Sequence, residues 1–290
     1  MSQSDLWAPT RRIEQAFTKA MHKLMRRLIR LVKGIHDPAN IIDTLREYAQ
    51  SPDFRKYAEA AARKMITGLF RDMGRTWRQA AAHHGMGRKL YLALMQELKG
   101  SRGGRLNQLI TETTFRITSL PTDLGKDVAT YVERESFKGR RASDIAQEIE
   151  AMFPERTTAK ANMIARTQVS YAHTNLIRSR AESLGIDWYQ WKAVGGERGD
   201  GRTRHAHRKI SGVLVKWTDP PAPEDLFPEY TKEGRKYKNS LGHYHAGQCP
   251  YCRCYPAPIV DLDTLAFPVR VYRNGKISTM NRKQFEQIMR

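Results

Sequence analysis

The chain has 290 residues and a mass of 33.4 kDa, enough for one large domain or two of ordinary size. Its 50 lysines and arginines outnumber 30 acidic residues, so the net charge of +20 favours contact with nucleic acid or an acidic protein surface. No apolar run approaches the ~20 residues of a membrane span, and the first residues lack the charged-then-apolar order of a signal peptide. We therefore expect a protein without membrane contact that stays in a reducing cytoplasm, where clustered cysteines hold metal more often than they form disulfides.

The first 120 residues are expected to be helical. Apolar residues three and four apart predict an amphipathic helix from about residue 13 to the Asp37-Pro38 pair. Further helices are expected over residues 39–49, 52–83 and 91–98, and the adjacent glycines within residues 101–105 predict a linker.

The polar face of the first helix is strongly basic. It carries Lys19, Lys23, Arg26, Arg27, Arg30 and Lys33. Such a face is commonly just solvated, but the net charge favours a role in tracking DNA phosphates or docking on an acidic partner. Arginines beside glycines are further candidates for phosphate contact: Arg102, Arg105, Arg140 and Arg141.

The middle of the chain predicts two helices separated at Pro154. Ser143 is expected to cap the first, which ends before Pro154. Thr157 or Thr158 is expected to cap the second, which ends at Gly185, where a left-handed residue belongs.

From residue 187 onward the pattern changes to short strands. These are expected at 188–194, 213–217, 259–260, 269–272 and 276–278, with a hairpin turn at Asn274-Gly275 and a last helix over 281–289. Residues 195–201 predict a glycine-rich turn, and residues 220–244 a long irregular loop. The expected fold class is α+β, with a mainly helical N-terminal half followed by a small α+β domain of short antiparallel strands.

All three cysteines, Cys249, Cys252 and Cys254, fall within six residues. The spacing of Cys249 and Cys252 lets two thiolates reach one zinc ion, and His205, His207, His243 and His245 could complete a tetrahedral site. Simple packing of the cysteines, or an oxidised pair, remain the alternatives.

Two histidines also suggest a catalytic alternative. His205 and His207 would lie on the same side of a strand, where one imidazole could act as the general base of a metal-dependent nuclease. Neither paired carboxylates nor a nucleophile, base and orienting group accompany them, and Asp200 lies in a turn where aspartate is common. We therefore expect no catalytic residues.

Four motifs, in this order, resemble the Mu F-like phage head morphogenesis family of minor head, or minor capsid, proteins. They are Ala165-Arg166-Thr167-Gln168, a strand ending in Trp191-Lys192-Ala193, the segment 200–207 followed by Ser211-Gly212, and Cys252-Arg253-Cys254. On the family pattern Arg202, Thr203, His207, Cys252, Arg253 and Cys254 occupy motif positions. Gln168 departs from the usual glutamate, Cys249 replaces a residue that is often His or Asn-Gly in character, and His205 is additional, so the ligand set of any metal site can differ here.

The resemblance implies a low-copy, non-enzymatic component of the virion that assembles in the bacterial host and associates with the portal and with capsid or scaffold protein. Some members of the family bind DNA, in agreement with the net charge. The implied organisation is a helical portal- or capsid-docking region over 1–120, a Mu F-like domain over 121–265 and a strand-and-helix extension over 266–290.

Overall fold

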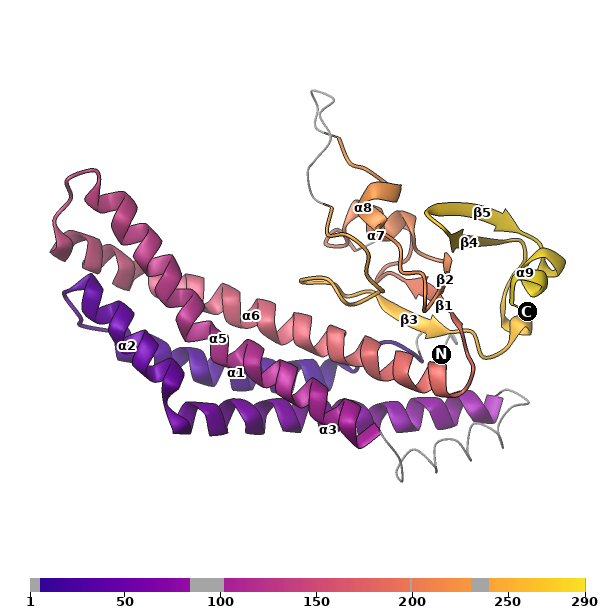
Figure 1. Cartoon of the computed structure of the whole chain (residues 1–290), viewed down its shortest axis with the longest axis horizontal. Helices are drawn as coiled ribbons and strands as arrows, with labels where there is room; N and C mark the ends of the chain where they lie inside the picture. The colour runs from indigo at the N-terminus through magenta and orange to yellow at the C-terminus, as the bar shows by residue number, and fades with distance from the viewer. Residues whose placement is uncertain (1–5, 84–101, 199, 231–239, 290) are drawn as a thin grey trace. The chain divides into compact units, whose positions relative to one another are not determined.

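A computed structural model describes residues 6–83, 102–198, 200–230 and 240–289 of the chain (Figure 1). It confirms the α+β fold class: long helices precede a small five-stranded sheet. The helix expected over 91–98 lies outside the described residues. None of the described helices is long and apolar enough to cross a membrane.

The backbone divides into two compact units. The helical unit comprises residues 11–68 and 102–168, and the sheet unit comprises the described parts of 1–10, 69–101 and 169–290. Two long helices, α3 (Pro52–His83) and α6 (Ala142–Ser183), contribute residues to both units. The division expected from the sequence, at residues 120 and 265, stays a prediction, because spatial proximity does not test an assignment of functional regions.

The helical unit begins with α1 (Arg11–Val32), whose apolar face is buried as its spacing predicts. The buried side chains are Ile13, Phe17, Met21, Leu24, Leu28 and Val32. The helix ends before the predicted Asp37-Pro38 pair, because Gly34 takes a left-handed φ of 79°. Asp37 instead caps α2 (Pro38–Gln50) by accepting a hydrogen bond from the amide of Ala39.

Two predicted interruptions in the following helices were wrong. Of the predicted linker, residue 101 lies outside the described residues, and residues 102–105 lie at the start of α5 (Arg102–Ser136), where glycine costs little because first-turn amides have no partner within the helix. Likewise, Pro154 lies within α6, and Ser143 bonds to Asp144 instead of capping. Apolar side chains on both sides of Pro154, among them Phe153 and Ala161, are buried, so packing keeps the helix continuous.

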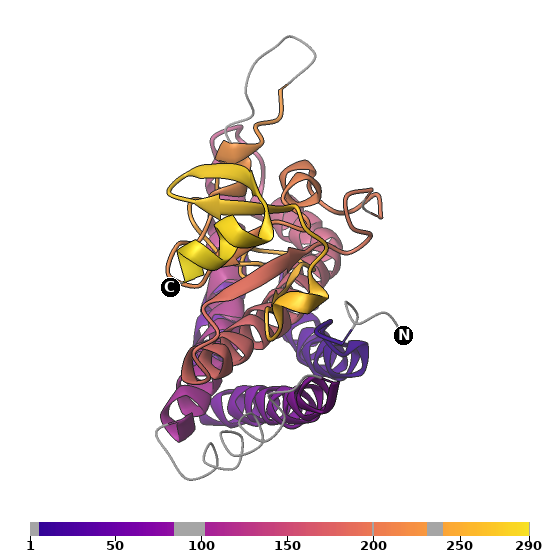
Figure 2. The ribbon, with the colours of Figure 1, turned by 90° about the vertical axis from the view of Figure 1, so that its right-hand side faces the viewer.

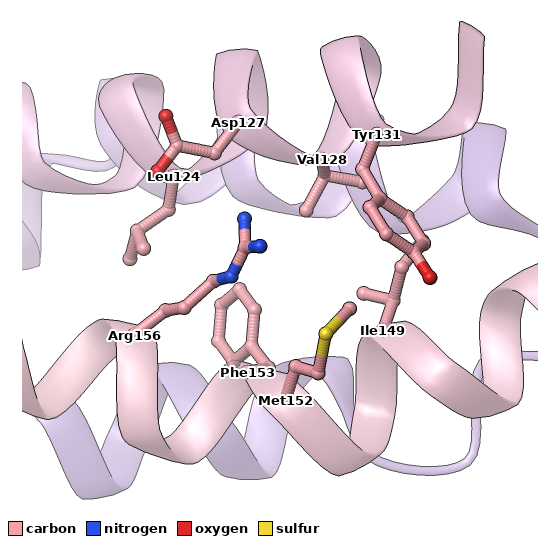
Figure 3. A pocket seen from close by; sticks show the side chains of 8 residues that line it. All are labelled: Leu124, Asp127, Val128, Tyr131, Ile149, Met152, Phe153 and Arg156. Carbon is pink, nitrogen blue, oxygen red and sulfur yellow. The ribbon is translucent and has the colours of Figure 1, made fainter. Parts of the chain in front are cut away.

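Side chains hold α5 against α6 within the helical unit. Arg140, in the turn between the two helices, donates two hydrogen bonds to the carboxylate of Glu148 on α6, at 2.8 and 2.7 Å, and one to Glu135 of α5 at 3.4 Å. The pairing with Arg140 lowers the pKa of Glu148 to about 2. The seam beside this pair is apolar: Val128 and Tyr131 of α5 face Ile149 and Phe153 of α6 (Figure 3). The space between them is about 20 Å³, close to the ~10–15 Å³ that one water needs, so it is a gap in packing and no ligand site.

The sheet has the order β3-β1-β2-β4-β5. Its strands are β1 (Trp188–Lys192), β2 (Leu214–Lys216), β3 (Tyr255–Pro258), β4 (Val269–Arg273) and β5 (Lys276–Met280). All neighbours pair antiparallel except β2 and β4, which are parallel at Leu214 and Val271. The strand expected at 259–260 comes earlier, at β3, whereas the hairpin turn is confirmed by positive φ at Asn274 and Gly275.

Strand β1 presents a different set of side chains to each face of the sheet. Trp188 joins Leu214, Val271 and Phe285 in one core, which α9 (Arg282–Met289) closes (Figure 2). The alternate residues Tyr189 and Trp191 are also buried and point to the opposite face. That second face carries the candidate site.

Candidate metal centre

The histidines of the 205–207 segment lie on a helix and not, as predicted, on a strand. The short helix α7 (His205–Lys209) buries Ala206 and His207, and Ile210 directly after it is buried as well. Residues three and four apart share a helix face, whereas residues two apart do not. His207 therefore points into the protein, and His205 lies outside the cluster that His207 joins.

His207 meets two of the three cysteines at one ring nitrogen. Its Nδ1 is 3.4 Å from Sγ of Cys254 and 3.6 Å from Sγ of Cys252. The three donor atoms lie within 4.8 Å of one another, and all three residues are buried. The arrangement could hold a metal ion, as the sequence suggested.

The other ring nitrogen of His207 is fixed by two polar groups. Its Nε2 is 2.8 Å from the hydroxyl of Tyr244, which donates to Oε1 of Glu224 at 2.6 Å. Glu224 belongs to α8 (Pro223–Leu226), within the loop that was expected to be irregular. A carboxylate behind a histidine holds the ring in one orientation and raises its basicity toward a metal. Sequence reasoning missed both partners, since no local spacing links them to His207.

Cys249 lies beside the three donors and hydrogen-bonds with Cys252. Its Sγ is 3.8 Å from Nε2 of His207 and accepts a 2.9 Å hydrogen bond from the guanidinium of Arg204. His243 is exposed and bonds to the carbonyl of Pro220. His245 is buried but contacts Tyr189 and Arg178 instead of the cysteines. Of the predicted ligands, the structure thus gathers His207, Cys252 and Cys254, with Cys249 beside them.

Hydrogen bonds inside the cluster shift its protonation. Burial lowers the pKa of His207, but hydrogen bonds with Cys249, Cys252 and Glu224 outweigh burial and raise it to about 11. The hydrogen bond with Cys252, together with burial, raises the pKa of Cys249 well above its usual range. His207 therefore retains its proton in the absence of metal, and an ion bound at its ring nitrogen would displace that proton.

Two hydroxyl groups of α6 hold the loop that carries the cysteines. Ser170 donates to the carbonyl of Cys252 at 2.9 Å, and Thr174 donates to the carbonyl of Ala246 at 2.6 Å. Between them Gly247 has a φ of 89°, and a Cβ there would lie 2.5 Å from Oγ1 of Thr174. Only glycine fits this close approach. Sequence reasoning missed all three residues.

An ion pair joins two of the sequence motifs. Arg253 donates to the carboxylate of Asp200 at 2.7 Å, and the same carboxylate accepts from the hydroxyl of Thr203 and from the amide of Arg202. The guanidinium of Arg253 holds the pKa of Asp200 well below its usual range. Asp200 thus both shapes its turn and fastens the Cys-Arg-Cys segment to α7, a second role that sequence reasoning did not assign.

Comparison with known proteins finds a family match for part of the chain. Residues 126–256 match the model of the family described as "Phage Mu protein F like protein". A curated protein of Haemophilus influenzae, described as uncharacterized, is 25% identical over 180 residues, which cover 62% of this chain and 34% of the relative. The chain thus spans about a third of the length of that relative. No solved structure matches the present chain. Residues 126–256, with His207 and all three cysteines among them, make up less than half of the chain, and over that part the chain is similar to the Mu F-like family.

Proposed function

We propose that this chain is a minor head protein of a tailed phage, which acts in procapsid assembly and DNA packaging. It would associate with the portal protein and with capsid or scaffold protein, and would contact DNA without regard to sequence. The observation that carries the proposal is the Mu F-like match over residues 126–256, since the family suggests a role in head morphogenesis and a virion component.

The metal centre would have a structural role in this protein, with zinc as its ion. Zinc–sulfur and zinc–nitrogen bonds of about 2.3 and 2.0–2.1 Å at a tetrahedral angle put sulfur and nitrogen roughly 3.6 Å apart. The Sγ–Nδ1 distances of 3.4 and 3.6 Å to Cys254 and Cys252 match that separation. A bound ion would join α7 to the cysteine loop, because His207 comes from one and the thiolates from the other.

DNA contact would fall to the basic face of α1. All six basic side chains of this face are exposed: Lys19, Lys23, Arg26, Arg27, Arg30 and Lys33. Among the described residues none of them forms an ion pair. They follow one stripe, centred roughly 150° around the helix from the buried face at 100° per residue. A cationic stripe without ion pairs to other described residues is available to a polyanion.

The test is association with heads. The tagged chain would be produced together with the portal and capsid proteins of the same phage, and the heads would be isolated by density-gradient sedimentation. We expect the chain to co-sediment at a few copies per head and to be captured with portal protein alone. Absence from heads and from portal complexes, in protein that is folded and loaded with metal, would exclude this function.

The alternative remains a metal-dependent nuclease that uses His205 or His207. A metal with three protein ligands can keep a position for water, which gives this alternative some support. His207 itself already contacts Tyr244 and two thiols, which leaves it poorly placed as a general base. We expect plasmid DNA to stay intact with the zinc-loaded chain. Cleavage that a chelator abolishes, and that His207→Ala protein lacks, would establish the nuclease instead.

A further inference from the structure

A pocket opens directly beside the cluster of His207, Cys252 and Cys254. Its volume is about 210 Å³, and its other lining residues are Arg202, Thr203, Arg204, Tyr251 and Arg253. A single water needs ~10–15 Å³ on this scale, so the pocket has room for a ligand of several atoms. Both its lining and its charge point to the chemistry of that ligand.

The lining is cationic. Three guanidinium groups border the pocket, and the ion pair of Arg253 with Asp200 balances one of them. Arg204 is held by neutral acceptors, the Pro250 carbonyl and the Cys249 thiol. Within the part of the chain that the structure describes, the side chain of Arg202 has no ion-pair partner. The excess of positive charge favours an anion.

The metal centre faces the same pocket. His207, Cys252 and Cys254 all line it, whereas Cys249 does not. The sulfur of Cys249 is 3.8 Å from Nε2 of His207 and hydrogen-bonds with Cys252, so it lies next to the three donors without being one of them. A tetrahedral ion on the three donors would need a fourth ligand, and a molecule in this pocket could supply it because all three donor residues line the pocket.

We propose that this pocket binds a phosphate group, with one oxygen at the fourth coordination position and the others bonded by Arg202 and Arg204. Planar guanidinium groups recognise phosphate through paired hydrogen bonds, and a dication adds a direct bond to an anionic oxygen. The inference rests on the metal centre of the proposed function but adds a ligand to it. The phosphate is either that of a nucleic-acid end or free phosphate, which share this chemistry.

The test uses the full chain loaded with Co²⁺, whose visible absorption reports changes in its ligands. Titration with inorganic phosphate should change the spectrum until saturation. Arg202→Gln should weaken phosphate binding by about tenfold or more, the effect of losing one charge-assisted hydrogen bond, while metal content stays the same. Arg198→Gln is the matched control, because Arg198 is an exposed arginine four residues away that does not line the pocket.

A second titration distinguishes the two sources of phosphate. It compares short single-stranded oligonucleotides that end in a 5′-phosphate or a 5′-hydroxyl. Binding of the phosphorylated form at lower concentration than free phosphate, with no spectral change from the hydroxyl form, identifies a nucleic-acid end. Tighter binding of free phosphate identifies the free ion. Either result supports the phosphate site.

Three results would overturn the proposal. If the chain binds Co²⁺ but gives the same spectrum with and without phosphate, the ion has no coordination position open to phosphate. A changed spectrum in Cys249→Ser protein would then identify Cys249 as the fourth ligand. Equal weakening of phosphate binding by Arg202→Gln and Arg198→Gln would show that phosphate responds to the overall positive charge and not to this pocket. A folded chain that binds no metal would refute the metal centre itself, while leaving head association to its own test.

Discussion

Replacing Arg26, Arg27 and Arg30 of α1 by glutamine removes half of the exposed basic stripe. The six cations extend over 15 residues, whose 14 steps of 1.5 Å span about 21 Å along the helix axis. One DNA strand presents a phosphate every 3.4 Å, so about six phosphates lie within reach of that length. We take about five contacts for the intact stripe. Arg27 counts for less than the others, because its guanidinium already lies 5.2 Å from the ring centre of Tyr48.

Counterion release turns this count into a salt dependence. With five contacts the logarithm of affinity should fall with the logarithm of salt at a slope of about −4.5, so binding weakens about 500-fold between 50 and 200 mM salt. The triple variant, which loses two or three contacts, should weaken only about 10- to 40-fold over the same range. Fluorescence anisotropy with a labelled duplex at several salt concentrations measures both slopes. Two duplexes of unrelated sequence should give the same values.

A control variant with the same change in net charge tests whether the effect is specific to α1. Arg55, Lys56 and Lys64 are exposed on α3 in the same helical unit, and their replacement by glutamine changes the net charge equally. This control should keep the parent slope. Equal flattening in both variants would show that overall charge, and not the stripe, binds DNA. If the α1 variant binds DNA as the parent does but no longer joins the portal, the stripe is a protein-docking surface. Arg102, Arg105, Arg140 and Arg141 would then be the next candidates for DNA contact.

Three further predictions concern the metal centre and its support, and a fourth concerns the buried His173 of α6. Cys252→Ser should lower metal content from the ~1 ion per chain of a structural site to below ~0.1, and should lower the melting temperature with it, as measured by elemental analysis and calorimetry. Glu224→Gln should weaken zinc affinity by roughly 10- to 100-fold in a chelator competition while leaving every ligand in place, and an unchanged affinity would deny Glu224 a role in orienting His207. Gly247→Ala should destabilise the protein by at least about 1–3 kcal/mol in urea unfolding, because its φ of 89° and the close Thr174 hydroxyl exclude a side chain; a stability equal to the parent would contradict the packing of this loop on α6. Burial lowers the pKa of His173 to about 4, below the ~6.5 of an unfolded histidine, so the unfolded state takes up a proton first and stability falls as pH drops from 6.5 toward 4. His173→Gln protein should lack about 2 kcal/mol of that loss at pH 5, and a parallel pH profile would show that His173 is not buried neutral.

Local spacing predicted the helical half well because each helix buries a face against its neighbours. The apolar residues of α1 are buried as their spacing requires, and the basic residues between them are exposed. Spacing failed at Pro154, since a proline lowers the preference for helix by a few kcal/mol and says nothing of the apolar contacts on either side of it. Those contacts keep α6 continuous over 42 residues.

The candidate site could be predicted by residue type but not by geometry. Three cysteines within six residues and the histidines near them indicated a site with soft ligands. Which histidine would join them depended on the structure of residues 205–209, because a strand would present His205 and His207 together whereas the helix presents only His207. A run of five residues is too short for its periodicity to decide between the two.

The groups that hold the site in place come from distant parts of the chain, and polar residues within α6 were the overlooked indication of them. Ser170 and Thr174 are four residues apart on a stretch of α6 that is buried on several sides, with Val169, Ala172 and Ile177 among its core residues. A hydroxyl group inside a core needs a hydrogen-bond partner, since an unpaired one costs about 1–3 kcal/mol. Two such groups on one helix face therefore imply a second segment whose backbone accepts from both. In this fold that segment is the loop of Ala246 and Cys252, so the two hydroxyls of α6 fix the path of the loop on which the cysteines reach His207.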